Sequence, residues 1–221
     1  MNRRDLARLI DHTNLRASAT VDDIKRLCDE ARTHGFASVV VNPSYVMLAS
    51  KELGSSQVLV CCVVGFPLGA MTSTVKAFEA RTAIEDGASE VDMVMNIGAL
   101  KSGLLDIVET DIRVVACEVK KSGKLLKVII EAPLLTYDEK KIACKIASAA
   151  GADFVKSCTG FADGANVADI KLMRETVGDR VGVKASGGIK SLDDAVRMIE
   201  AGANRIGTSS GVKIMEESHE R

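Results

Sequence analysis

Aromatic side chains are scarce in this sequence, and neither sign of charge prevails. The 221 residues include no Trp, two Tyr and five Phe, and 29 Lys and Arg stand against 30 Asp and Glu, for a formal net charge of −1. Nucleic-acid binding relies on a basic surface that contacts phosphates and on aromatic side chains that stack against bases. The composition therefore argues against a nucleic-acid partner.

Long hydrophobic runs are missing as well. The longest apolar stretch, residues 58–71, has 14 residues and contains two glycines and a proline, whereas a helix that spans a membrane needs about 20 residues. Near the start of the chain, Asp5, Arg8 and Asp11 interrupt the apolar run that a secretory signal would need. We therefore expect a cytosolic protein without a membrane segment.

Candidate metal ligands and paired cysteines are few. The three histidines, His12, His34 and His219, are far apart, and the six cysteines form no Cys-x-x-Cys pair. Zinc sites and disulfide frameworks usually show closely spaced ligands or regular cysteine patterns. We expect buried free thiols, no metal and no cofactor.

Short segments rich in β-branched residues alternate along the chain with longer amphipathic segments. This alternation is typical of βα units that build a parallel sheet. The expected strands are residues 9–13, 37–41, 58–64, 90–95, 127–131, 153–157, 180–186 and 204–209. The expected helices include residues 21–35, 74–87, 106–123, 137–151, 167–178 and 191–202.

Eight strands in 221 residues allow about 28 residues per βα unit, close to the spacing of an eight-stranded barrel. The sequence therefore predicts an α/β fold in which residues 1–221 form one domain, a single (β/α)8 TIM barrel. A doubly wound open sheet could use the same elements. However, the G-x-G-x-x-G signature that usually follows the first strand of such a sheet is absent.

Several predicted strands contain charged residues. Both faces of a strand in a parallel barrel are buried, so a charged side chain there must be paired or must line a ligand cavity. Alternation along the strands places Asp92, Lys156 and Lys184 on the inward side, and Lys127 and Glu131 share that side by the same parity. An internal salt-bridge network without chemistry is the alternative. The late position of both Lys156 and Lys184 in their strands favours an active site, which in barrels lies at the C-terminal strand ends.

Two inward lysines on neighbouring strands suggest amine chemistry. A lysine attacks a carbonyl only when it is unprotonated, and its ordinary pKa is about 10.4. A second ammonium at ~5.5 Å costs about 3 kcal/mol at an effective dielectric constant of ~20, which lowers the pKa by about two units. Burial lowers it further. We expect Asp92 to pair with one of the two lysines, Lys156 and Lys184, and to leave the other as the nucleophile.

Glycines and hydroxyl residues follow the seventh and eighth predicted strands. Residues 186–188 read Ser-Gly-Gly, and residues 207–211 read Gly-Thr-Ser-Ser-Gly. In barrels these two loops often bind a phosphate through backbone N–H groups and helix N-termini. Ordinary turn and capping chemistry is the alternative, but the two loops together favour a phosphate site.

Eight strings in this order resemble the deoxyribose-phosphate aldolase family, Schiff-base (class I) aldolases with a (β/α) barrel fold. The resemblance covers nearly the whole chain. The strings are LIDHTNL at 9–15, VNPSYV at 41–46, GFPLGA at 65–70, EVDMVMNIG at 90–98, KVIIE at 127–131, FVKSCTGF at 154–161, VGVKASGGI at 181–189 and RIGTSSG at 205–211.

The resemblance implies a lyase that cleaves 2-deoxy-D-ribose 5-phosphate to D-glyceraldehyde 3-phosphate and acetaldehyde in deoxyribose phosphate catabolism. It implies Lys156 as the Schiff-base lysine, Lys184 as the second active-site lysine and Asp92 as the acid/base residue. The substrate-binding positions that it implies are Asp11, Thr13, Thr159, Gly160, Gly187, Gly188, Gly207, Ser209 and Ser210. The expected partner is a small sugar phosphate, and a homo-oligomer is left open.

The chain departs from the family pattern at three places. Val40 stands where many relatives have Cys, EAPLL fills residues 131–135, and Phe161 stands where some members place a Lys near the phosphate. Two other functions stay open: a different Schiff-base sugar-phosphate aldolase, or a non-catalytic sugar-phosphate sensor. The polar tail, residues 212–221, is expected either to fray or to reach toward the phosphate site.

Overall fold

Eight parallel strands close into a barrel in the computed structural model, which describes residues 1–218. The strands are β1 (Ile10–Thr13), β2 (Ser38–Val41), β3 (Leu59–Val64), β4 (Glu90–Val94), β5 (Leu125–Ile129), β6 (Phe154–Lys156), β7 (Gly182–Ser186) and β8 (Arg205–Thr208). The ring closes between β1 and β8, where Ile10 is in register with Ile206. The predicted (β/α)8 barrel is confirmed, and the open-sheet alternative is wrong because this last pairing leaves no sheet edge.

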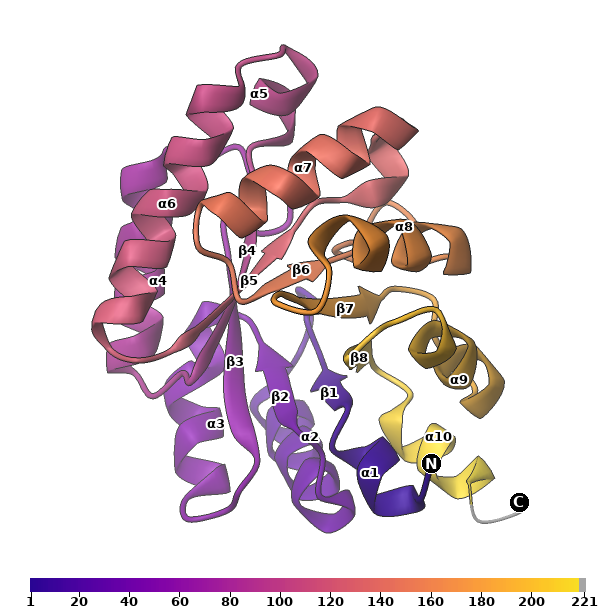
Figure 1. Cartoon of the computed structure of the whole chain (residues 1–221). Coiled ribbons are helices and arrows are strands. Elements are labelled where there is room, and N and C mark those ends of the chain that lie inside the picture. Colours follow the sequence, from indigo (N-terminus) through magenta and orange to yellow (C-terminus); the bar gives the residue numbers. More distant parts are fainter. Residues whose placement is uncertain (219–221) are drawn as a thin grey trace.

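Helices form an outer layer around the strands (Figure 1). They are α1 (Arg3–Ala7), α2 (Val21–His34), α3 (Val46–Leu53), α4 (Ser73–Glu85), α5 (Ile97–Lys101), α6 (Leu105–Lys121), α7 (Tyr137–Ala149), α8 (Val167–Val177), α9 (Leu192–Glu200) and α10 (Gly211–Glu217), with short 3-10 turns at Pro43–Tyr45 and Ala132–Leu134. The six predicted helices are confirmed to within a few residues. Several helices start at a capping box, in which Thr20, Thr136 or Ser191 exchanges hydrogen bonds with the acidic residue three positions later.

The C-terminal tail differs from both expectations for residues 212–221. Most of it forms α10, which lies beside α9 (Figure 1) and also packs against α2 and β1. Ile214 and Met215 are buried in this contact, and Glu217 accepts a hydrogen bond from the backbone N–H of Leu192. Residues 219–221, including the candidate ligand His219, lie outside the described part of the chain.

The barrel interior has an apolar side and a charged side. Val40, Cys61 and Val63 pack with Leu15 and Phe66 inside β2 and β3. The remaining strands contribute the inward-facing charged residues described below, while the outward-facing residues pack against the helices in the main core. Charged side chains therefore face one half of the lumen, and mainly apolar side chains face the other half.

One inward prediction was wrong. β5 ends at Ile129, and Glu131 adopts a left-handed conformation with φ 53° just after it. This turn takes the Glu131 carboxylate to the following loop, where it accepts hydrogen bonds from Thr159 rather than from the lysines.

None of the helices within residues 1–218 is long and apolar enough to cross a membrane.

Candidate active site

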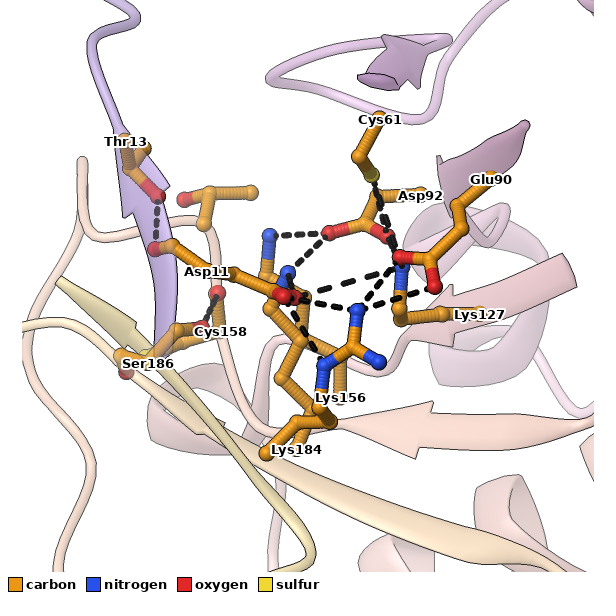
Figure 2. Close-up of polar contacts among 12 residues, drawn as sticks. Asp11, Thr13, Cys61, Glu90, Asp92, Lys127, Lys156, Cys158, Lys184 and Ser186 are labelled. Atoms are coloured by element: carbon orange, nitrogen blue, oxygen red, sulfur yellow. Dashed lines mark hydrogen bonds and ion pairs between the residues drawn. The ribbon is translucent and has the colours of Figure 1, made fainter. Parts of the chain in front are cut away.

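Asp92 is the centre of the charged side of the lumen (Figure 2). Its Oδ2 accepts hydrogen bonds from Lys156 Nζ at 2.9 Å and from Lys184 Nζ at 2.8 Å. Its Oδ1 accepts from Lys127 Nζ at 2.8 Å and from Cys61 Sγ at 3.1 Å. The expectation that Asp92 would pair with one lysine is therefore wrong. The lumen is narrow enough for amines from three strands to reach the same carboxylate.

Two further carboxylates continue this arrangement toward the N-terminal ends of the strands. The amine of Lys184 lies between Asp11 and Asp92 and pairs with Asp11 Oδ2 at 2.5 Å (Figure 2). Glu90 pairs with Lys127 at 2.6 Å and with the guanidinium of Arg205 at 2.7 Å, and Arg205 also pairs with Asp11 at 2.7 Å. Sequence reasoning missed Glu90 and Arg205. The signal was present, because Glu90 shares the inward parity of Asp92.

The pKa values of the three lysines are shifted in different directions. Burial is the main cause that lowers the pKa of Lys156, and the ammonium of Lys184 adds to it, while Asp92 opposes both. Burial also disfavours the charged form of Lys184, but Asp11 and Asp92 together raise its pKa above the ordinary value. Lys127 likewise has a raised pKa, because Asp92 and its other carboxylate partners outweigh burial. Of the three lysines, Lys156 is thus the one whose neutral form its surroundings favour, whereas the surroundings of Lys127 and Lys184 favour the ammonium form.

Asp92 itself stays ionised. Burial would raise its pKa, but the three lysines hold the pKa of this carboxylate well below the usual range. A persistent carboxylate that touches both Lys156 and Lys184 can accept a proton transiently and return it.

A cavity of about 940 Å³ opens at the C-terminal ends of the strands. Lys156 is 3% exposed and lines it, whereas Lys127 and Lys184 are fully buried and do not. The predicted residues that line the cavity are Thr13, Thr159, Gly160, Gly187, Gly188, Gly207 and Ser209. Asp92, Asp11 and Ser210 do not line it, because Asp92 and Asp11 lie deeper in the lumen and Ser210 stands at the start of α10.

The two glycine-containing loops meet at one end of this cavity. Gly187 and Gly188 have φ values of 87° and 74°, a conformation that favours glycine. Thr208, the last residue of β8, donates to the carbonyl of Ile189 at 2.7 Å and so ties the end of β8 to the loop after β7. The backbone of both loops therefore faces a common space, as an anion site at strand ends requires.

Gly207 also has a packing role. A Cβ at this position would lie 2.9 Å from the Cβ of Ser186 and 3.1 Å from Cε of Lys184. The absence of a side chain at Gly207 leaves the lumen free for Lys184 to extend to Asp92.

Two residues beside the cavity were not predicted as part of the site. Glu131 Oε2 accepts a hydrogen bond from Thr159 Oγ1 at 2.5 Å, which holds Thr159 against the cavity wall. His12, which the sequence suggested only as a sparse metal ligand, pairs through Nε2 with Glu30 at 2.6 Å, and burial lowers its pKa. Across residues 1–218, His, Cys, Asp and Glu form no group of three or more that could hold a metal ion.

The fold and this site define a class of protein: a parallel barrel with a lysine of lowered pKa at the base of a cavity at the strand ends, the arrangement that Schiff-base chemistry needs. The chain belongs to the DeoC/LacD family of aldolases, whose sequence model matches residues 6–217.

Individual relatives match over nearly their full length. The chain is 57% identical over 215 residues to the deoxyribose-phosphate aldolase of Clostridium tetani, covering 97% of this chain and 99% of that protein. It is 59% identical over 213 residues to that of Finegoldia magna, covering 96% and 99%. Among solved structures, the tetrameric deoxyribose phosphate aldolase of Aeropyrum pernix superposes with a TM-score of 0.91 at 37% identity, covering 97% of this chain and 91% of that one.

Proposed function

We propose that this protein is a lyase that cleaves 2-deoxy-D-ribose 5-phosphate to D-glyceraldehyde 3-phosphate and acetaldehyde. One observation carries the proposal. The amine of Lys156 lines the cavity, touches Asp92 and has a pKa lowered by burial. A neutral lysine amine attacks the carbonyl carbon of an aldehyde. Relatives named deoxyribose-phosphate aldolase support the choice of sugar.

The proposed reaction begins when the Lys156 amine adds to C1 of the open-chain sugar and loss of water forms a protonated imine. A base removes the proton of the C3 hydroxyl, and the C2–C3 bond breaks. Its electron pair moves to the iminium, which leaves an enamine on the lysine and releases D-glyceraldehyde 3-phosphate. Protonation at C2 restores an iminium, and water then releases acetaldehyde and the free amine.

Asp92 is the proposed acid/base residue for these transfers. Neither Asp92 nor Lys184 lines the cavity, but Asp92 Oδ2 lies 2.8 Å from the Lys184 amine and 2.9 Å from the Lys156 amine, which does line it. The proposed transfers therefore pass from Asp92 through Lys184 or a held water to the reacting atoms beside Lys156. Lys184 is thus the proposed second active-site lysine. Asp11, which pairs with Lys184, takes a supporting position behind it rather than contacting the sugar.

The phosphate is proposed to bind at the end of the cavity where the two glycine loops meet. Backbone N–H groups there suit an anion, and Lys190 lines the same cavity. Phe161, which also lines the cavity, offers no charge. The proposed phosphate-binding residues are Gly187, Gly188, Gly207 and Ser209, which line the cavity, and Ser210, which stands beside it at the start of α10. Thr13, Thr159 and Gly160 are proposed to lie beside the sugar.

We also propose that residues 1–221 act as one domain in cytosolic deoxyribose phosphate catabolism, with no nucleic-acid or membrane partner. The description of the Aeropyrum pernix relative as tetrameric supports a homo-oligomer as the assembly to test.

A product assay tests the proposal. The purified protein is incubated with 2-deoxyribose 5-phosphate, and acetaldehyde and glyceraldehyde 3-phosphate are measured separately. We expect equal amounts of both, much less product from unphosphorylated 2-deoxyribose, and unchanged rates with a chelator, because the iminium is the electron sink. Cleavage of another sugar phosphate instead would favour a different Schiff-base aldolase. Binding of the sugar without products would indicate a sensor.

A further inference from the structure

The charged groups in the lumen are unequal in number. Ion pairs join four cationic side chains (Lys127, Lys156, Lys184, Arg205) to three carboxylates (Asp11, Glu90, Asp92), and we call these seven residues the lumen network. All but Arg205 are at most 3% exposed at their side chains, and Arg205 is 13% exposed. A surplus charge is costly in such a place. A lysine can remove it by losing a proton, whereas a guanidinium cannot.

We propose that Arg205 is a positioning residue whose fixed positive charge is the surplus cation of the lumen network, so that Lys156 is left as a neutral amine. This inference rests on the proposed role of Lys156 as the Schiff-base lysine. It assigns a function to a residue that does not line the cavity and cannot touch the sugar.

The contacts of Arg205 carry the argument. Its Nε donates to Asp11 Oδ1 at 2.8 Å, and its terminal nitrogen donates to both oxygens of Glu90 at 2.8 and 2.7 Å. Asp11 is also the partner of Lys184, and Glu90 is also the partner of Lys127. The guanidinium therefore shares Asp11 with Lys184 and Glu90 with Lys127. As a result, the ammonium forms of both lysines depend more on Asp92 for their stabilisation.

The same contacts explain why Lys156 is the residue that loses its proton. Lys184 has two carboxylate partners, Asp11 and Asp92, and Lys127 also has two within 2.8 Å. Lys156 has one, and it shares Oδ2 of Asp92 with Lys184. The titratable groups that face Lys156 are Cys61 from β3, Asp92 from β4 and Lys184 from β7. Lys156, the lysine that lines the cavity, therefore has the fewest carboxylate contacts to stabilise its ammonium form.

The balance of charges in the lumen network predicts how substitutions shift the pH at which Lys156 loses its proton. Replacing Arg205 by Met leaves three lysines with three carboxylates, so Lys156 should keep its proton to higher pH. Replacing Glu90 by Gln removes a negative charge and should have the opposite effect. The double variant Arg205→Met/Glu90→Gln again has one cation more than carboxylates. It should behave like the unmodified protein although both side chains are lost.

The test measures the pH at which Lys156 becomes reactive. Each protein is mixed briefly with acetaldehyde over a range of pH and quenched with borohydride, and the reduced adduct on Lys156 is quantified by peptide mass. We expect the midpoint to rise by about one pH unit in Arg205→Met, the effect of a unit charge at roughly 10 Å with an effective dielectric constant of ~20. It should fall in Glu90→Gln, and it should stay near the original value in the double variant and in Arg205→Lys.

The outcomes separate the two proposals. If the unmodified protein forms no adduct on Lys156, the proposed function is wrong. If it does, but the Arg205→Met midpoint is unchanged or the double variant is shifted further, the role of Arg205 is wrong. Should Arg205→Met fail to fold, Glu90→Gln and the double variant still decide: equal midpoints in Glu90→Gln and the unmodified protein would overturn the inference.

Discussion

Lys76 and Lys156 are both buried lysines beside an aspartate, yet they lie in different regions. Burial lowers the pKa of each. Lys76 extends from α4, donates to Asp111 of α6 at 2.6 Å and to the carbonyl of Val94 at 2.9 Å, and is fully buried. Lys156 lies inside the barrel and lines the cavity.

The difference between them is access and charge balance. Lys76 has one carboxylate partner in the helical layer, so its pair is neutral overall. Lys156 shares its carboxylate with two other lysines and has a cavity in front of its amine. A lowered pKa is therefore not sufficient to mark a nucleophile, because the amine must also have room for a carbonyl carbon beside it.

The largest expected effect on activity comes from removing the amine of Lys156. Lys156→Met should lower kcat by at least ~10⁴-fold, because no other residue can form the proposed covalent intermediate. The fold should persist, because the amine removed is the neutral one and the three remaining cations (Lys127, Lys184, Arg205) match the three carboxylates of the lumen network. Steady-state rates and circular dichroism check both parts. A variant that retains a tenth of the activity would show that Lys156 is not the nucleophile.

Lys76→Met should have its effect on stability instead. It leaves Asp111 as an unpaired buried carboxylate, which typically costs about 3–5 kcal/mol of unfolding free energy. The activity of the folded fraction should not change. Denaturant unfolding and rates below the transition measure the two quantities.

The matched control is the double variant Lys76→Met/Asp111→Leu, which removes both charges and should recover most of the stability. A structural role for Lys76 would be contradicted if Lys76→Met unfolded like the unmodified protein but lost activity together with adduct formation on Lys156.

A third prediction concerns the second lysine of the site. Lys184→Leu removes the ammonium that helps to lower the pKa of Lys156, so the neutral amine should appear only at higher pH. Activity at neutral pH should fall by about 10²-fold or more. Recovery in alkali should be only partial, because the proposed proton relay through Lys184 is lost as well. The pH dependence of single-turnover trapping separates the two contributions. An unchanged midpoint would mean that burial alone sets the pKa and that Lys184 serves the relay.

The smallest expected effect is at the cavity wall. Glu131→Ala frees the Thr159 hydroxyl and backbone N–H from the carboxylate that holds them. We expect about a tenfold loss of kcat/KM, the size of one hydrogen-bonded positioning contact, with no change in the trapping midpoint. Thr159→Val serves as the control. A normal kcat/KM in both variants would remove Thr159 from the substrate site.

Strand parity alone placed Asp92, Lys156 and Lys184 together, because side chains alternate strictly between the lumen and the helices. Parity could also have found Glu90, which precedes Asp92 by two positions. It could not show that one carboxylate would bind three lysines, since this depends on the width of the closed barrel. Asp11 came only from the resemblance, and the structure puts it behind Lys184 rather than at the cavity.

Other features had no local signal. The short helices α1, α5 and α10 have five to seven residues, too few for a clear period. Glu131 takes a left-handed conformation that sequence patterns reserve for glycine. The Lys76 and Asp111 pair joins two helices through residues 35 positions apart, and each looks like an ordinary surface residue of an amphipathic helix.

We infer that access and charge balance together make Lys156 the nucleophile of the lumen. The decisive experiment is treatment with acetaldehyde and then borohydride at neutral pH, followed by peptide mapping of every lysine. An ethyl group on Lys156, with Lys76, Lys127 and Lys184 unmodified, is the predicted result. Modification of Lys184 in place of Lys156, or of no lysine in the lumen, would contradict the account.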